Sequence, residues 1–140
     1  MERPPFHLAL PITSVSEARA FYGELLGCPE GRSADLWIDF DFRGHQLSLH
    51  VRDVPLPDAG TTPVDGKQVP LPHFGLVLEL GPWRELAERL RGASVEFLIE
   101  PCTRFAGEPG EQATMFFRDP FGNALEVKAF ADIQRGMFAP

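Results

Sequence analysis

Short segments of alternating hydrophobic and polar residues recur along this chain, and two segments with helical spacing interrupt them. Period-two alternation places successive side chains on opposite faces and therefore predicts strands. These strands are expected over residues 6–12, 36–43, 46–51, 73–78, 95–99, 114–118 and 124–128. In each strand, leucine, isoleucine, valine or phenylalanine marks the face that should pack in the core.

The first helix is expected to begin at Ser14 and to end at Gly27. Ser14-Val-Ser-Glu17 has the spacing of a capping box, and a glycine suits the left-handed residue that closes a helix. The apolar stripe of this helix comprises Val15, Ala18, Tyr22 and Leu25.

The second helix is expected to begin with Pro82 at its first position and to end at Gly92. Trp83, Leu86 and Leu90 form its apolar stripe. Asp119-Pro120-Phe121-Gly122 is typical of a type I turn that closes a hairpin before the last strand.

The two halves of the chain look like copies of one another. Each opens on a histidine, His7 or His73, continues through a helix, and ends in two or three antiparallel strands. Aligning Gly44 with Gly122 places Ser48 opposite Glu126. We therefore predict an α+β fold in one domain, made of module one (5–52), a connector (53–72), module two (73–130) and a C-terminal arm (131–140).

The connector is rich in proline and glycine, which predicts an irregular segment. Such a long irregular segment inside a small domain is unusual unless it joins modules or covers a site. We interpret it as a linker and a candidate lid.

Composition narrows the function. The chain has 140 residues and a net charge of −7 without a basic run, which argues against nucleic acid and membrane partners. No apolar run approaches the roughly 20 residues that span a bilayer, and the first residues lack a signal-peptide pattern. Cys28 and Cys102 are isolated, as expected of reduced thiols in a cytoplasmic protein.

Three residues form a candidate metal site. His7, His73 and Glu126 each lie on the polar face of their strand, opposite the leucines and valines. Two imidazoles and one carboxylate with open positions resemble the facial triad of Fe(II) enzymes, with Mn, Ni, Co or Zn as alternatives. Taken singly, each could be an ordinary solvated side chain; the repeat relates all three by one symmetry.

Five further residues are candidates for catalysis or substrate binding. His50 lies about 6–7 Å beyond Ser48 on the same face, where it is a candidate for proton transfer, a fourth ligand or a rim residue. Gln46 and Ser48 share this face, and Trp37 alternates onto a polar face. Arg104 lies in a glycine- and proline-rich loop. It is a candidate for holding an anionic group of the substrate, or else it is an ordinary solvated arginine.

The chain resembles the vicinal oxygen chelate superfamily, which includes glyoxalase I, extradiol dioxygenases, and fosfomycin and bleomycin resistance proteins. The resemblance rests on Phe-His-Leu-Ala-Leu-Pro at 6–11, on the helix at 20–27, and on Phe-Arg-Asp-Pro-Phe-Gly-Asn-Ala-Leu-Glu at 117–126. It implies paired βαβββ modules around a metal-binding cup, and a homodimer. His7, His73 and Glu126 match the first, third and fourth ligand positions, and Ser48 stands where glyoxalase I has a glutamate.

Three functions follow from these observations. The first is a metal-dependent enzyme acting on a small oxygenated molecule, with extradiol-type dioxygenation as the preferred reaction because three ligands leave open positions. The second is a glyoxalase-like isomerase or an antibiotic-modifying transferase. The third, of a different class, is a metal-free protein that sequesters a small molecule, as bleomycin resistance proteins do.

Overall fold

The structure is a computed structural model that describes residues 3–53 and 59–138. The chain divides into two compact units. Unit 1 comprises Met1–Pro57 with Pro120–Asn123, and unit 2 comprises Asp58–Asp119 with Ala124–Pro140. None of the helices in the described ranges is long and apolar enough to cross a bilayer.

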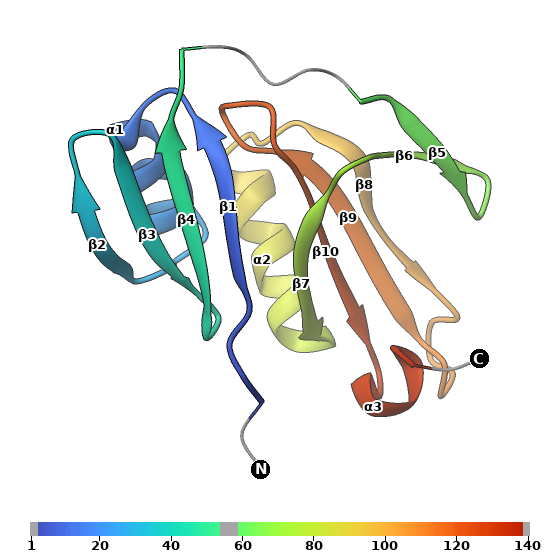
Figure 1. Cartoon of the computed structure of the whole chain (residues 1–140). Helices are drawn as coiled ribbons and strands as arrows, with labels where there is room; N and C mark the ends of the chain where they lie inside the picture. The colour runs from blue at the N-terminus through green and yellow to red at the C-terminus, as the bar shows by residue number, and fades with distance from the viewer. Residues whose placement is uncertain (1–2, 54–58, 139–140) are drawn as a thin grey trace. The chain divides into compact units, whose positions relative to one another are not determined.

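Unit 1 contains one four-stranded sheet with a short helical segment. Its elements are β1 (His7–Ile12), α1 (Val15–Ala18), η1 (Arg19–Leu25), β2 (Glu30–Ala34), β3 (Trp37–Phe42) and β4 (His45–Val51). The strand order is β1-β4-β3-β2, with β1 parallel to β4 and the other pairs antiparallel (Figure 1).

Unit 2 repeats this arrangement and adds a hairpin and a short last helix. Its elements are β5 (Thr61–Val64), β6 (Lys67–Pro70), β7 (Phe74–Glu79), α2 (Leu80–Gly92), β8 (Phe97–Arg104), β9 (Gln112–Arg118), β10 (Ala124–Phe130) and α3 (Ile133–Gly136). The sheet order is β7-β10-β9-β8, again with one parallel pair, β7 with β10. The α+β fold of two βαβββ modules is confirmed.

The strand register also confirms the predicted alignment of the two copies. In unit 1, Ala9 pairs with Ser48, and in unit 2, Gly75 pairs with Glu126. Ala9 and Gly75 each follow the opening histidine by two residues, so Ser48 and Glu126 occupy equivalent positions on β4 and β10.

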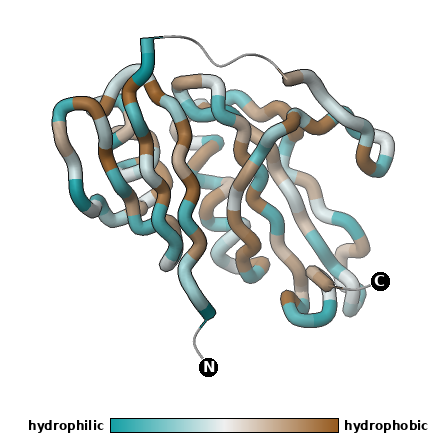
Figure 2. The backbone as a smooth tube through the Cα atoms, viewed as in Figure 1, coloured by the Kyte–Doolittle hydropathy of each residue, from teal (hydrophilic) through white to brown (hydrophobic). Residues whose placement is uncertain are grey.

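Alternation within the strands determines which face is buried, as the hydropathy along β3 and β10 illustrates (Figure 2). Ile38 and Phe40 are almost fully buried in unit 1, as are Leu125 and Val127 in unit 2. Trp83 of α2 packs against the buried face of the second sheet, and its indole N–H donates to the carbonyl of Val127 over 2.8 Å. The apolar faces therefore pack in the cores, and the polar faces remain for other roles.

The first helix differs from the prediction. Ser14 caps it as expected, accepting the N–H of Glu17 over 3.2 Å, and Gly27 has a φ of 74°. After one α-helical turn, however, residues 19–25 form a π-helix. This winding buries Ala18, Tyr22 and Leu26, whereas Val15 and Leu25 of the expected stripe are only half-buried.

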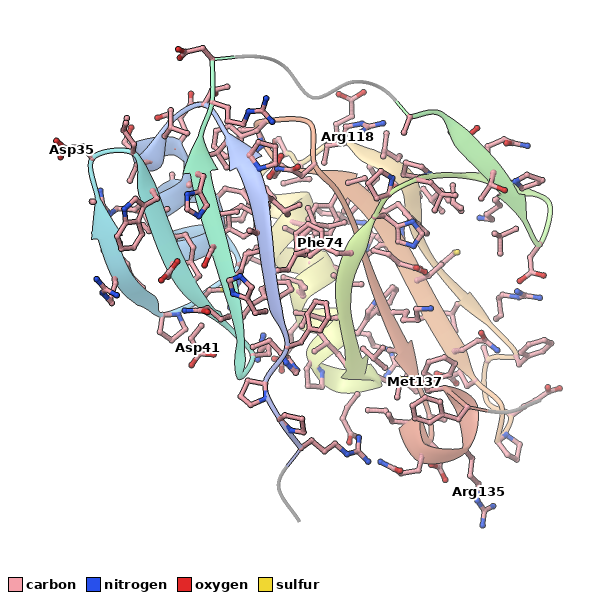
Figure 3. The ribbon with its side chains drawn as sticks, viewed as in Figure 1. Asp35, Asp41, Phe74, Arg118, Arg135 and Met137 are labelled. Atoms are coloured by element: carbon pink, nitrogen blue, oxygen red, sulfur yellow. The ribbon has the colours of Figure 1, made fainter. Side chains whose placement is uncertain are left out.

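The connector also differs from the prediction, because residues 61–70 form a hairpin. The turn between its strands has Asp65 and Gly66 at positive φ, 48° and 79°. The remaining part of the predicted connector at 54–58, and positions 139–140 of the predicted arm, lie outside the described residues. Within the arm, residues 133–136 form α3, which contains Arg135 and is followed directly by Met137 (Figure 3).

Two further boundaries differ from the prediction, and one strand was not predicted. The strand expected at 95–99 runs from Phe97 to Arg104, and so takes up part of the expected loop. Pro82 is the third residue of α2 rather than the first. β2 was not predicted because all five of its residues are exposed and show no alternation.

Candidate metal site and cavity

His73 and Glu126 approach each other on the polar face of the unit 2 sheet. His73 immediately precedes β7, and Glu126 lies on the neighbouring β10. His73 Nε2 lies 3.3 Å from Glu126 Oε1, and their side chains are 23% and 14% exposed. The second carboxylate oxygen, Oε2, accepts the Thr114 hydroxyl over 2.6 Å. The carboxylate is therefore oriented by one hydrogen bond and directs its other oxygen at the imidazole.

The contact of the second nitrogen of His73 determines which ring nitrogen carries the proton. Nδ1 lies 2.7 Å from the carbonyl oxygen of Pro70, and because a carbonyl only accepts, Nδ1 carries the proton. The ring also packs edge-on against Phe116, with centroids 5.0 Å apart. These contacts fix the imidazole with Nε2 toward Glu126, in the manner of metal-binding histidines whose other nitrogen is held by a carbonyl.

This pair fits a divalent cation. A separation of 3.3 Å can be bridged by a proton on Nε2, as in an ion pair, or by a metal ion bound to both atoms. Two ligands about 2.1 Å from one ion, at angles of about 90–110°, are about 3.0–3.4 Å apart. The separation of Nε2 and Oε1 therefore matches adjacent ligands of one metal ion.

His7 has a corresponding arrangement in unit 1. Its Nδ1 lies 2.8 Å from Gln46 Oε1, and Gln46 Nε2 lies 3.4 Å from the Asp39 carboxylate. Because the amide N–H₂ faces a carboxylate, the amide oxygen must face His7 and accept its Nδ1–H. Ser48 donates to the other oxygen of Asp39 over 2.6 Å. His7, like His73, is thus held through Nδ1, and Nε2 is the nitrogen that carries the lone pair.

The structure brings two of the three predicted metal ligands together. His73 and Glu126 belong to unit 2, and His7 belongs to unit 1. Across residues 3–53 and 59–138, no group of three His, Cys, Asp or Glu side chains is placed to hold a metal ion.

The other predicted site residues divide between the two units. In unit 1, His50 is exposed on β4 and pairs in register with Trp37, whose ring contacts the guanidinium of Arg32 at 5.5 Å. In unit 2, Arg104 forms an ion pair of 2.7 Å with Asp65 in the turn of the β5–β6 hairpin. The expected loop arginine is therefore a strand residue that fastens the hairpin to β8.

A cavity of about 580 Å³ opens beside His73 and Glu126, entirely within unit 2. The sheet forms one wall, including Thr114, Phe116 and Lys128, and the hairpin contributes Val64, Asp65, Lys67 and Val69. Such a volume accommodates a small organic molecule. Part of the predicted connector therefore lines this cavity.

Sequence reasoning missed Thr114, Lys67 and Lys128. Nothing in the sequence indicated that Thr114 bonds Glu126, because their contact depends on the register between β9 and β10. A signal did exist for the lysines: they are the only two in the chain.

Comparison with known families identifies the class of protein. Residues 5–127 match the model of the Glyoxalase/Bleomycin resistance protein/Dioxygenase superfamily. The chain therefore belongs to this superfamily, also called the vicinal oxygen chelate superfamily. Among curated proteins there is no significant match.

Solved structures agree with this assignment. A glyoxalase/bleomycin resistance protein/dioxygenase from Alicyclobacillus acidocaldarius is 31% identical, with 96% of each chain covered and a TM-score of 0.75. A glyoxalase/dioxygenase from Nostoc punctiforme is 19% identical, covering 93% of this chain and 92% of its own, with a TM-score of 0.70. A fosfomycin resistance protein from Listeria monocytogenes is 18% identical, covering 97% and 99%, with a TM-score of 0.69. The last two show the shared fold.

Proposed function

We propose that this protein is a divalent-metal-dependent enzyme acting on a small oxygenated molecule, with extradiol-type dioxygenation as the preferred reaction. His73 and Glu126 would hold the metal, with His7 as the third ligand, from the same chain or from a second copy in a homodimer. The observation that carries the proposal is the 3.3 Å approach of His73 Nε2 to Glu126 Oε1, with both groups fixed from behind by hydrogen bonds.

The donor set favours Fe(II), since two imidazoles and one carboxylate suit this ion, with Mn, Ni, Co and Zn as alternatives. When bound, Fe(II) would supply oxygen activation, and the other ions would supply Lewis acidity. The cavity beside Glu126 would hold the substrate, and His50 is the candidate for proton transfer. In the preferred reaction, both atoms of O₂ enter a catechol ring that is cleaved.

Metal binding is tested with variants of three of the four histidines and of Glu126. We expect His7→Ala and His73→Ala to lose metal in calorimetric titrations of chelator-treated protein with Mn²⁺. His45→Ala is the matched control, because His45 Nδ1 accepts the backbone N–H of Phe6 over 2.8 Å. Glu126→Gln keeps the shape of the side chain and should also lose metal. Metal affinity equal to wild type in both His73→Ala and Glu126→Gln would overturn the proposal.

The reaction class is tested on metal-loaded protein. We expect protein loaded anaerobically with Fe(II) to consume O₂ with catechol as the probe. Activity without O₂ uptake, supported by Mn²⁺ or Ni²⁺, would instead support an isomerase or transferase. Ligand binding by metal-free protein that does not take up metal would support sequestration.

A further inference from the structure

Lysine is scarce in this chain and is concentrated at one place. Of the 13 lysines and arginines, only Lys67 and Lys128 are lysines. Both line the cavity of unit 2, Lys67 from the hairpin and Lys128 from β10. Every lysine of the protein therefore borders the space beside the candidate metal site.

The cationic groups of the cavity differ in what they contact. Arg104 is engaged by Asp65 at 2.7 Å, and Lys128 Nζ lies 3.8 Å from Glu126 Oε1. Lys67 Nζ instead contacts the Cys102 thiol sulfur at 3.7 Å. Within the described part of the chain, no carboxylate oxygen lies at ion-pair distance from Lys67. This ammonium group therefore has hydrogen-bonding capacity for a ligand.

The charge of the cavity is opposite to that of the protein. Three cationic side chains against two carboxylates give the lining a net charge of +1, whereas the whole chain carries −7. Apolar side chains such as Ile99, Phe116 and Phe130 form other parts of the wall. Because all three cationic side chains are exposed to solvent at the edge of the cavity, their attraction for an anion is screened and modest.

We propose that this cavity selects a small organic anion, a carboxylate or phosphonate with an apolar body, and that Lys67 binds its charged group. The apolar body would contact the wall that includes Phe116. This inference deepens the proposed function, on which it rests, by making the substrate of the metal site an organic acid. Lys67 would act as a specificity-determining residue on the hairpin.

The test compares anionic and neutral ligands of one shape on metal-free protein. Benzoate and phenylphosphonate are the anionic probes, and benzamide is the neutral probe, each titrated by calorimetry into chelator-treated full-length chain. A charge-assisted hydrogen bond in a partly exposed site should give the anions roughly 5- to 10-fold tighter binding. The two anions distinguish a carboxylate site from a phosphonate site.

Substitutions assign this preference to Lys67. Lys67→Met keeps most of the side-chain length without the charge and should bind benzoate and benzamide equally. Lys67→Arg should restore the preference for the anion. The control is Arg91→Met, which removes one positive charge from α2, outside the cavity lining, and should leave the preference unchanged.

Amine labelling provides a second measurement because Lys67 and Lys128 are the only lysines of the chain. Acetylation of Lys67, followed by mass spectrometry, should slow in the presence of benzoate but not benzamide. Equal binding of anions and benzamide by wild type, or an unchanged preference in Lys67→Met, would overturn the inference. Since these measurements use metal-free protein, that result is distinguishable from loss of metal in the His73 and Glu126 variants.

Discussion

The hydrogen bond from Thr114 to Glu126 offers a sharp test of the metal site. Thr114→Val removes the hydroxyl group and retains the branched shape of the side chain. In the wild type, this hydroxyl donates to Glu126 Oε2 over 2.6 Å, and the Glu126 side chain is only 14% exposed. The carboxylate is mostly buried but borders the cavity, so water would replace the lost donor only in part.

The expected size of the effect follows from these numbers. A hydrogen bond to a charged group contributes about 1.5–3 kcal/mol. Without it, the carboxylate must be ordered when metal binds, so we expect the dissociation constant for Mn²⁺ to rise by roughly tenfold or more. The fold should persist, because a β-strand position such as 114 accepts valine readily.

The assay is a calorimetric Mn²⁺ titration of chelator-treated protein, with thermal unfolding measured in parallel. Thr114→Ser keeps a hydroxyl group and should bind metal within a few-fold of wild type. Thr103→Val, at an exposed position on β8, controls for the same chemical change elsewhere on the sheet. The reasoning is refuted if Thr114→Val binds Mn²⁺ as tightly as wild type, or if Thr114→Ser is weakened to the same extent.

Three further outcomes are expected. Gly75→Ala should destabilise the protein and weaken Mn²⁺ binding, because a Cβ at this position would overlap the backbone carbonyl oxygen of Glu126. Gly81→Ala is the control: its Cβ would meet nothing within 4 Å, so it should be neutral or stabilising in thermal unfolding. Iodoacetamide at pH 8, followed by mass spectrometry, should modify half-exposed Cys102 well before Cys28, because burial shields the Cys28 thiol and raises its pKa to about 11. Equal rates of modification of the two thiols would contradict this. Because the unfolded thiol ionises near its ordinary pKa of 9.0, Cys28 should make denaturant stability fall as pH rises from about 9 to 11, and Cys28→Ala should lessen that fall.

The sequence predicted the parts of the fold in which burial is one-sided. Ile38, Phe40 and Phe42 alternate with Trp37 and Asp39, and this pattern arises because β3 packs one face in the core. Exposure on both faces removes the pattern, and for that reason β2 was missed. The π-helix was missed for a different reason, since the buried residues at 18, 22 and 26, within it and at its two ends, are also compatible with α-helical spacing.

Proline content concealed the β5–β6 hairpin. Pro63 and Pro70 lie within its two strands, and proline normally argues against a strand because it cannot donate a backbone hydrogen bond. A two-stranded ladder tolerates proline, since each strand has one edge without a partner strand. That this segment borders a site was therefore predicted only from the length and position of the connector in the chain.

The site itself could be predicted only as far as the repeat extended. Equivalent positions gave His7, His73 and Glu126, and the register between parallel strands confirms the equivalence of Ser48 and Glu126. Contacts between different strands, such as that of Thr114 with Glu126, depend on how the two strands are aligned. The alternation of hydrophobic and polar residues within one strand does not determine this register. Lys67 required the hairpin itself, because its neighbour Cys102 is 35 residues away in sequence.

The two copies of the module have diverged in a complementary way. In unit 1, the carboxylate lies on β3 as Asp39, which pairs with Ser48 and, through Gln46, fixes His7. In unit 2, the equivalent pair is Phe116 with Glu126, so the carboxylate lies on the strand next to the histidine and faces its Nε2. One module thus contains an oriented imidazole, and the other contains an imidazole, a carboxylate that faces it and the cavity. The duplicated fold therefore keeps a histidine in both copies but a glutamate on the strand beside it in only one copy, because Ser48 occupies the position equivalent to Glu126.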